Sequence, residues 1–154
     1  MKEISKSLQE THKIAERVLA HIQTIAQNRS DKEKSAAVLA LTGDLGAGKT
    51  AFVKAVAKAY GITEEITSPT FVIMKRYDIS PEFSRIFEQL FHIDAYRLEH
   101  ASELQKLGWD AIVADSRNLI CIEWPEKVSG CIPAHAFHIQ FTHVDETTRE
   151  IEFS

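Results

Sequence analysis

The chain has 154 residues, of which 44% are hydrophobic and 26% charged, and its formal net charge is −4. This length and composition predict one globular domain that spans residues 1–154. The negative charge argues against a protein that coats nucleic acid over a broad surface, because such binding needs a basic excess. No apolar stretch approaches the ~20 residues of a membrane span and no signal-peptide pattern opens the chain, so we expect a cytoplasmic protein with no membrane partner.

The first part of the chain alternates helix and strand patterns. Ser7 and Glu10 form an S-x-x-E capping box, which predicts a helix that begins at Leu8. A continuous apolar run over 36–42 indicates a buried strand. Apolar residues at helical spacing then predict a second helix over 49–60. The glycine-rich segment GDLGAGKT joins this strand to this helix.

The second part of the chain adds more strands. The segments TFVIMKRYDI and RIFEQLFHID predict two antiparallel strands on either side of the turn SPEFS. A helix is expected around Glu103, Leu104 and Leu107, and NLICIEW predicts another apolar strand. The tail segments AFHIQFTHV and REIEF predict a terminal hairpin across the turn DETT. Strands that alternate with helices indicate an α/β layered fold.

The joining segment matches the phosphate-binding pattern G-x-x-x-x-G-K-[ST] in full, and it lies between a strand and a helix as that pattern requires. Its glycines permit the backbone angles that turn successive N–H groups toward a phosphate, and the following helix directs its positive end to the same place. Lys49 is expected to neutralise the β- and γ-phosphates of ATP, and Thr50 to ligate Mg²⁺. The predicted nucleotide contacts of the loop are Gly43, Asp44, Leu45, Gly46, Ala47, Gly48, Lys49 and Thr50.

Two carboxylates follow predicted strands, where P-loop proteins place groups that hold a metal or position water. Glu123 follows LICI and Asp94 follows LFHI. The alternatives are a solvent-exposed strand end for Glu123, and a helix cap or an ion pair with Arg97 for Asp94. Arg97 could instead stabilise charge in the transition state, and His92 could be catalytic or a hydrogen-bonded structural histidine. The sequence leaves these choices open.

Other residues near the loop have two interpretations each. Ser68 and Thr70, in SPTF, occupy a segment where P-loop proteins place switches that sense the γ-phosphate, although a proline turn is an equal alternative. Trp124 could contact the nucleotide or pack against Pro125. Leu45 is expected to pack as an anchor for the loop, and Asp44 could cap the turn.

The chain resembles the TsaE family, also called YjeE, in the segments GDLGAGKT, SPTF, HIDAYRL and IEWPE, and also in SLQETHKIAERV near the start. The resemblance covers most of the chain. It implies a P-loop NTPase three-layer sandwich with a mixed, mainly parallel sheet, antiparallel additions and the C-terminal hairpin. The segment between Tyr77 and Phe91 is longer than expected for the family, which bears on partner docking.

The resemblance also implies an activity. The family comprises Mg²⁺-dependent ATPases that are weak alone and act with TsaB and TsaD in the threonylcarbamoyl modification of tRNA, so contact with tRNA is indirect, through the complex. By position, the resemblance implies that Lys49 and Thr50 hold phosphate and Mg²⁺ and that Glu123 completes the metal site. It further implies that Asp94 acts in hydrolysis and that Thr11 and Trp124 lie beside the nucleotide, with Thr11 near the adenine.

Two other functions remain as alternatives. A small-molecule P-loop kinase would use the same loop, but such enzymes need an arginine-bearing lid, and the arginines after the loop are scattered. A non-catalytic module whose bound nucleotide only shapes a docking surface is the second alternative. The carboxylates Asp94 and Glu123 argue against that module.

Overall fold

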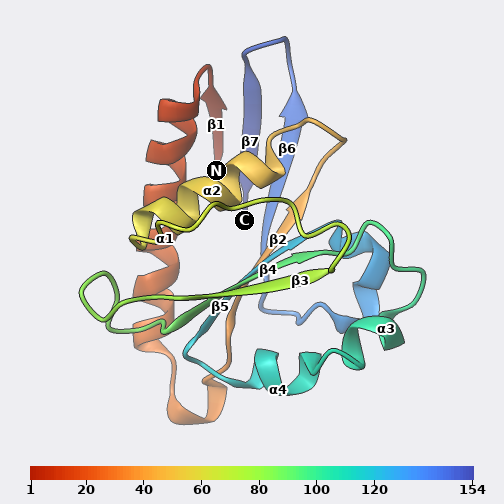
Figure 1. The fold of residues 1–154 in the computed structure, drawn as a ribbon. Coiled ribbons are helices and arrows are strands. Elements are labelled where there is room, and N and C mark those ends of the chain that lie inside the picture. The colour runs from red at the N-terminus through yellow and green to blue at the C-terminus, as the bar shows by residue number, and fades with distance from the viewer.

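The computed structural model describes residues 1–154 and is built on one seven-stranded sheet with helices on both faces (Figure 1). The strand order is β1-β7-β6-β2-β5-β4-β3. In chain order the strands and helices are β1 (Lys2–Ser5), α1 (Leu8–Asn28), β2 (Ala37–Thr42), α2 (Lys49–Ala59), β3 (Met74–Asp78), β4 (Gln89–Asp94), α3 (Ala101–Gln105), α4 (Trp109–Ala114), β5 (Asn118–Glu123), β6 (Phe137–His143) and β7 (Arg149–Phe153), with 3₁₀ turns at Asp31–Glu33 and Pro125–Cys131.

The centre of the sheet is parallel and its edges are antiparallel. Strand β2 pairs in parallel with β5 and β6, and β5 pairs in parallel with β4. Strand β3 adds antiparallel to β4 on one side, while β7 and then β1 add antiparallel to β6 on the other. The predicted mixed sheet and C-terminal hairpin are confirmed.

Two apolar cores lie on the two faces of the sheet. One core packs α1 and α2 against the sheet, and it includes Phe52, Leu39 and Cys121. The other core packs α3 and α4 against the opposite face around Trp109 and Ile120. All six residues of β5 are buried, because a central parallel strand is covered on both sides. This three-layer arrangement leaves the carboxyl ends of the parallel strands at one edge of the sheet.

Helix α1 begins where its sequence predicts. The Ser7 hydroxyl accepts a hydrogen bond from the Glu10 amide at 3.1 Å, which satisfies one free N–H group of the first turn. The Glu10 carboxylate does not return to Ser7 but accepts from the Lys6 amide, one residue earlier. Helix α1 is 21 residues long, yet no helix of the structure is both long and apolar enough to cross a bilayer.

The structure differs from the sequence expectations in several details, among them the strand expected over RIFEQLFHID, which begins only at Gln89. Strand β1 was not predicted, because its four residues gain their partners only from β7 at the far end of the chain. Strand β3 begins at Met74 rather than Thr70, since Ile73 has a φ of 68° that breaks the extended backbone. The helix expected around Leu107 ends at Gln105, and a separate helix, α4, follows Gly108.

Candidate nucleotide-binding site

The glycine-rich loop leaves β2 after Thr42 and enters α2 at Lys49. Gly43, Gly46 and Gly48 have φ values of 146°, 76° and 109°, a region that side chains rarely adopt. A Cβ added at Gly43 would also stand 2.5 Å from the carbonyl oxygen of Phe141. These positions therefore favour glycine, the residue type that a phosphate-binding nest of backbone N–H groups needs where φ is positive.

Lys49 is held over this loop. Lys49 is 6% exposed, and its Nζ donates to the carbonyl oxygens of Gly43 and Asp44, at 2.9 Å for Asp44. The same Nζ lies 4.3 Å from the ring centroid of Trp124. Burial lowers the pKa of Lys49, while nearby carboxylates, that of Glu123 first among them, act in the opposite direction. A bound phosphate would add further negative charge and so favour the charged ammonium.

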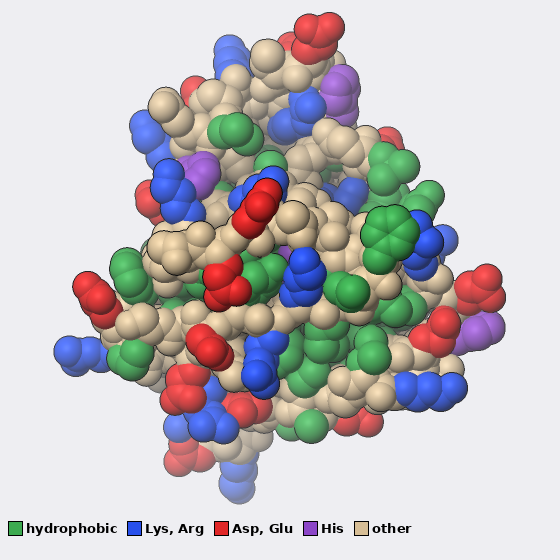
Figure 2. All heavy atoms as spheres, in the orientation of Figure 1, with side chains coloured by type: hydrophobic (Ala, Val, Ile, Leu, Met, Phe, Trp, Pro, Cys, Tyr) green, Lys and Arg blue, Asp and Glu red, His purple; other side chains and the backbone are tan.

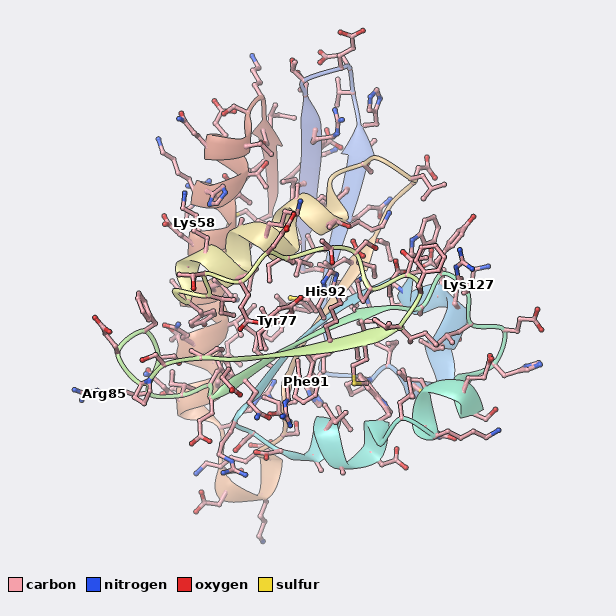
Figure 3. All side chains as sticks on the ribbon, in the orientation of Figure 1. Lys58, Tyr77, Arg85, Phe91, His92 and Lys127 are labelled. Carbon is pink, nitrogen blue, oxygen red and sulfur yellow. The ribbon has the colours of Figure 1, made fainter.

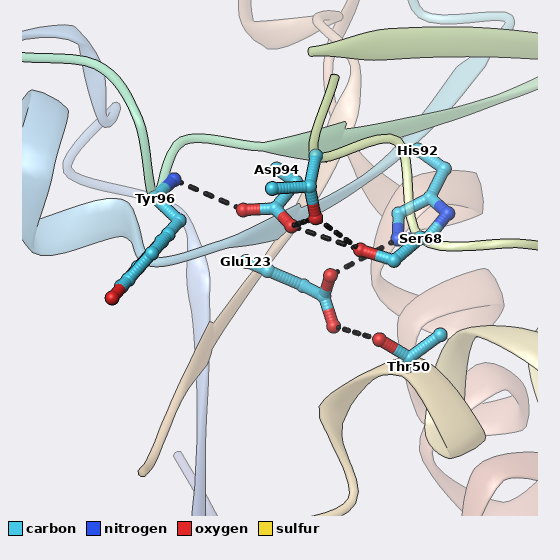
Figure 4. Close-up of polar contacts among 7 residues, drawn as sticks. Thr50, Ser68, His92, Asp94, Tyr96 and Glu123 are labelled. Atoms are coloured by element: carbon cyan, nitrogen blue, oxygen red, sulfur yellow. Dashed lines mark hydrogen bonds and ion pairs between the residues drawn. The ribbon is translucent and has the colours of Figure 1, made fainter. Parts of the chain in front are cut away.

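Two carboxylates stand side by side at the ends of β4 and β5. Asp94 and Glu123 are register partners on adjacent parallel strands, and both are buried, at 4% and 2% exposed. The Thr50 hydroxyl, in the first turn of α2, donates to Glu123 Oε1 at 2.8 Å (Figure 4). This hydrogen bond joins the glycine-rich loop to the end of β5. Glu123 is therefore not the solvent-exposed strand end that the sequence left as an alternative.

Asp94 holds the loop that precedes β3. Its Oδ2 accepts from Ser68 at 2.9 Å and from Thr70 at 2.7 Å, and its Oδ1 accepts from the Tyr96 amide at 2.9 Å (Figure 4). The hydrogen bonds from Ser68 and Thr70 could not be read from local sequence, because they join segments more than twenty residues apart, whereas the bond from the Tyr96 amide spans two residues and is a local backbone cap by Asp94. Arg97 lies 4.4 Å from the ring centroid of Phe71, so its guanidinium stacks on an aromatic ring instead of pairing with Asp94.

One pocket gathers these groups, and we call it the phosphate pocket. It contains both predicted switch residues and most of the loop. Its lining comprises Leu45, Gly46, Gly48, Lys49, Thr50, Ala51, Ser68, Thr70, Asp94, Tyr96, Glu123 and Trp124. Tyr96 was not predicted as a site residue; its ring packs against Trp124 with centroids 5.0 Å apart. Gly43 and Ala47 belong to the loop but do not line this pocket, and neither does Asp44.

A second pocket lies on the other side of the loop, and we call it the terminal pocket. It shares Gly46, Gly48 and Ala51 with the phosphate pocket, and its remaining lining is Ser5, Lys6, Ser7, Leu8, Thr11, Glu146, Thr147 and Arg149. Thr11 is thus brought to the loop, with its hydroxyl 2.7 Å from that of Ser5. Sequence reasoning missed the other terminal residues, because they meet only when the two ends of the chain pair.

The expected packing role of Leu45 is wrong. Leu45 is 73% exposed and belongs to neither apolar core. Asp44 contributes to the loop through its backbone, whose carbonyl accepts from the Ala47 amide at 3.1 Å. No side-chain cap from Asp44 is present among the hydrogen bonds of the loop.

Comparison with known proteins identifies the family. The model of the family described as threonylcarbamoyl adenosine biosynthesis protein TsaE matches residues 5–151. The chain belongs to the TsaE family. Among curated relatives named tRNA threonylcarbamoyladenosine biosynthesis protein TsaE, that of Bacillus subtilis is 35% identical over 86% of this chain and 78% of its own, and that of Treponema pallidum is 37% identical over 74% and 78%.

The TsaE fold is also found in a solved structure. The crystal structure of Bacillus subtilis YdiB superposes with a TM-score of 0.69 at 29% identity, covering 99% of this chain and 83% of that chain. The predicted P-loop NTPase fold is thereby confirmed, and family and fold together imply nucleotide binding. The side chains that contact the nucleotide remain predictions. The geometry described above gives only the positions of these side chains.

Proposed function

We propose that this protein is a Mg²⁺-dependent ATPase, formed by one P-loop domain of residues 1–154, that serves the N6-threonylcarbamoyladenosine modification of tRNA together with TsaB and TsaD. The observation that carries the proposal is the hydrogen bond from Thr50 to Glu123 beside the buried Lys49. It brings a hydroxyl, a carboxylate and a cation to the mouth of a phosphate-binding loop. The family's name indicates the process, which is threonylcarbamoyladenosine biosynthesis, and the groups of this site support binding and hydrolysis of ATP.

The donor set suits Mg²⁺ bound together with nucleotide phosphates. No group of three or more His, Cys, Asp or Glu side chains gathers to hold a metal by itself. Mg²⁺ characteristically uses one or two protein ligands and takes the rest from phosphates and water. The Thr50 hydroxyl gives its hydrogen to Glu123 and keeps its lone pairs for a cation. Thr50 and Glu123 would hold the ion, which supplies charge stabilisation on the β- and γ-phosphates.

Each remaining group has a role in this proposal. The backbone amides of 43–50 bind the phosphates, and Lys49 leaves the loop carbonyls to neutralise them. Asp94 accepts a hydrogen bond from the attacking water and orients it, since its carboxylate stands one strand away from Glu123. Thr11 and the rest of the terminal pocket contact the nucleoside, and Trp124 packs beside the phosphates. Ser68 and Thr70 sense nucleotide through Asp94.

The surface around the phosphate pocket supports action with partner proteins. Leu45 and Tyr96, which line the pocket, are 73% and 43% exposed, and Phe71, next to Thr70, is 84% exposed. Contiguous exposed apolar patches mark protein contacts, and we propose that these three residues belong to such a patch. On the face that Figure 2 shows, basic and acidic side chains are interspersed, which agrees with indirect contact with tRNA. We expect the protein to act in the cytoplasm, where tRNA is modified.

The decisive experiment measures ATP hydrolysis with and without TsaB and TsaD, beside tRNA modification in the same reactions. We expect weak hydrolysis by the protein alone, faster hydrolysis with both partners, and repeated cycles of modification only when ATP is hydrolysed. The Lys49→Ala protein is the control for contaminating ATPases. Hydrolysis that the partners leave unchanged, or steady phosphorylation of a metabolite by the protein alone, would contradict the proposal and favour a small-molecule kinase.

A further inference from the structure

His92 is a buried histidine on β4 that the proposed chemistry does not yet use. Its side chain is fully buried, and its Nε2 lies 3.3 Å from Oε2 of Glu123 on the neighbouring strand (Figure 4). Its other ring nitrogen, Nδ1, has no hydrogen-bond partner in the protein. The ring therefore has one polar contact, and that contact is the carboxylate proposed to hold the metal.

This contact determines where the ring hydrogen lies. A carboxylate accepts hydrogen bonds and cannot donate them when ionised, so the nitrogen that faces it must carry the hydrogen. Neutral His92 is then the Nε2–H tautomer, with the Nδ1 lone pair directed into the protein. The alternative tautomer would turn two lone pairs toward each other in a buried site, which is unfavourable.

Glu123 is consequently held at both oxygens. Thr50 donates to Oε1 at 2.8 Å, and His92 in the Nε2–H tautomer donates to Oε2. Since the Glu123 side chain is 3% exposed, water has little access to replace either donor. The two hydrogen bonds fix the plane of the carboxylate, and they leave Oε1 directed at the start of α2, where the phosphates and the ion of the proposed function would lie.

We propose that His92 is a positioning residue that orients Glu123 for Mg²⁺ through its Nε2–H group. This inference rests on the proposed function, because it concerns the metal site of that function. Partners that orient a metal ligand are commonly worth about 10- to 100-fold in metal affinity or activity. An apolar side chain at this position would leave the buried Oε2 without a donor, so plain packing does not account for a histidine here.

A second buried polar group on the same side of the sheet provides a control. Tyr77 on β3 and His92 on β4 lie on one side of this strand pair, and Phe91 lies on the other (Figure 3). The Tyr77 hydroxyl, like His92 Nδ1, has no hydrogen-bond partner, and burial raises its pKa. Tyr77→Phe therefore removes a buried polar atom near His92 without touching Glu123.

The test compares His92→Leu, His92→Asn, His92→Gln and Tyr77→Phe in the full chain. A glutamine amide can reach the position of Nε2 and donate, whereas an asparagine amide is one bond shorter and a leucine has no donor.

The readouts are the affinity for a fluorescent ATP analogue in EDTA and the Mg²⁺ concentration that half-maximally alters this binding. We expect the Mg²⁺ requirement to rise about 10- to 100-fold in His92→Leu and His92→Asn. We expect His92→Gln and Tyr77→Phe to stay near the parental value, with the affinity in EDTA unchanged in all four.

Equal Mg²⁺ requirements in the parent and in His92→Leu would overturn the inference. An equal rise in the Mg²⁺ requirement of His92→Gln and His92→Asn would also overturn it, because such a result indicates that His92 only packs. If His92→Leu does not fold, the comparison of His92→Gln with His92→Asn still tests the inference. The tautomer is read separately from the ring ¹⁵N shifts of His92 in the nucleotide-free protein, and an Nδ1–H ring would refute the inference. If Mg²⁺ does not change nucleotide binding by the parent protein, the proposed function is refuted instead. The tautomer measurement then still reports on the contact between His92 and Glu123.

Discussion

The phosphate pocket and the terminal pocket lie on opposite sides of one glycine-rich loop but are built differently. The carboxylates of the phosphate pocket stand at the ends of adjacent parallel strands, are buried, and are held by hydrogen bonds. The terminal pocket is formed by β1, the start of α1 and the β6–β7 turn, and Glu146 and Thr147 there are exposed. Side chains that must hold an exact geometry are best placed on rigid elements, and the two carboxylates lie on central strands of the sheet, whereas the terminal pocket depends on the chain ends and an exposed turn.

Lys49→Ala tests the glycine-rich loop, which lies between the two pockets, and should have the largest effect. We expect nucleotide affinity to fall on the order of 100-fold or more, because several charge-assisted hydrogen bonds to phosphate are lost together. Titration with a fluorescent ATP analogue measures it. Lys54→Ala is the matched control, since Lys54 is an exposed lysine on the same helix. Comparable affinities in the two variants would show that the nucleotide lies elsewhere.

Asp94→Ala tests the phosphate pocket alone. We expect nucleotide binding to be retained and hydrolysis with TsaB and TsaD present to fall about 10²- to 10⁴-fold, the usual contribution of a general base. The change also removes the hydrogen bonds to Ser68 and Thr70, so the Ser68→Ala, Thr70→Val double variant is the control. Parental hydrolysis by Asp94→Ala would refute its catalytic role, and equal losses in the double variant would assign Asp94 to holding the loop.

Thr11→Val tests the terminal pocket and should have the smallest effect. One hydroxyl beside a nucleoside contributes about 1 kcal/mol, so affinity should fall about 3- to 10-fold while the maximal rate of hydrolysis stays unchanged. Thr24→Val is the control, because Thr24 is an exposed threonine of α1 that bonds only to the carbonyl of Ala20. A large loss of rate in Thr11→Val would remove the distinction between the two pockets.

Much of the fold and of the phosphate pocket follows from local sequence. The loop can be predicted because each of its residues acts through its own backbone or side chain, as at Gly43 and Lys49. Glu123 and Asp94 can be predicted because each terminates an apolar strand, and parallel strands bring such ends to one edge. Strand β1 could not be predicted, since its four residues carry a weak pattern and form a strand only against β7.

The sequence by itself determined the phosphate-binding loop, the alternation of helices and strands, and the two strand-end carboxylates, because spacing along the chain encodes all three. Only the tertiary structure decided which of these groups meet: Thr50 with Glu123, the SPTF segment with Asp94, and His92 with the second oxygen of Glu123. Each of these pairs joins residues more than twenty positions apart. Contacts of that kind depend on the register and order of strands, which the packing of the whole sheet sets and no local pattern specifies.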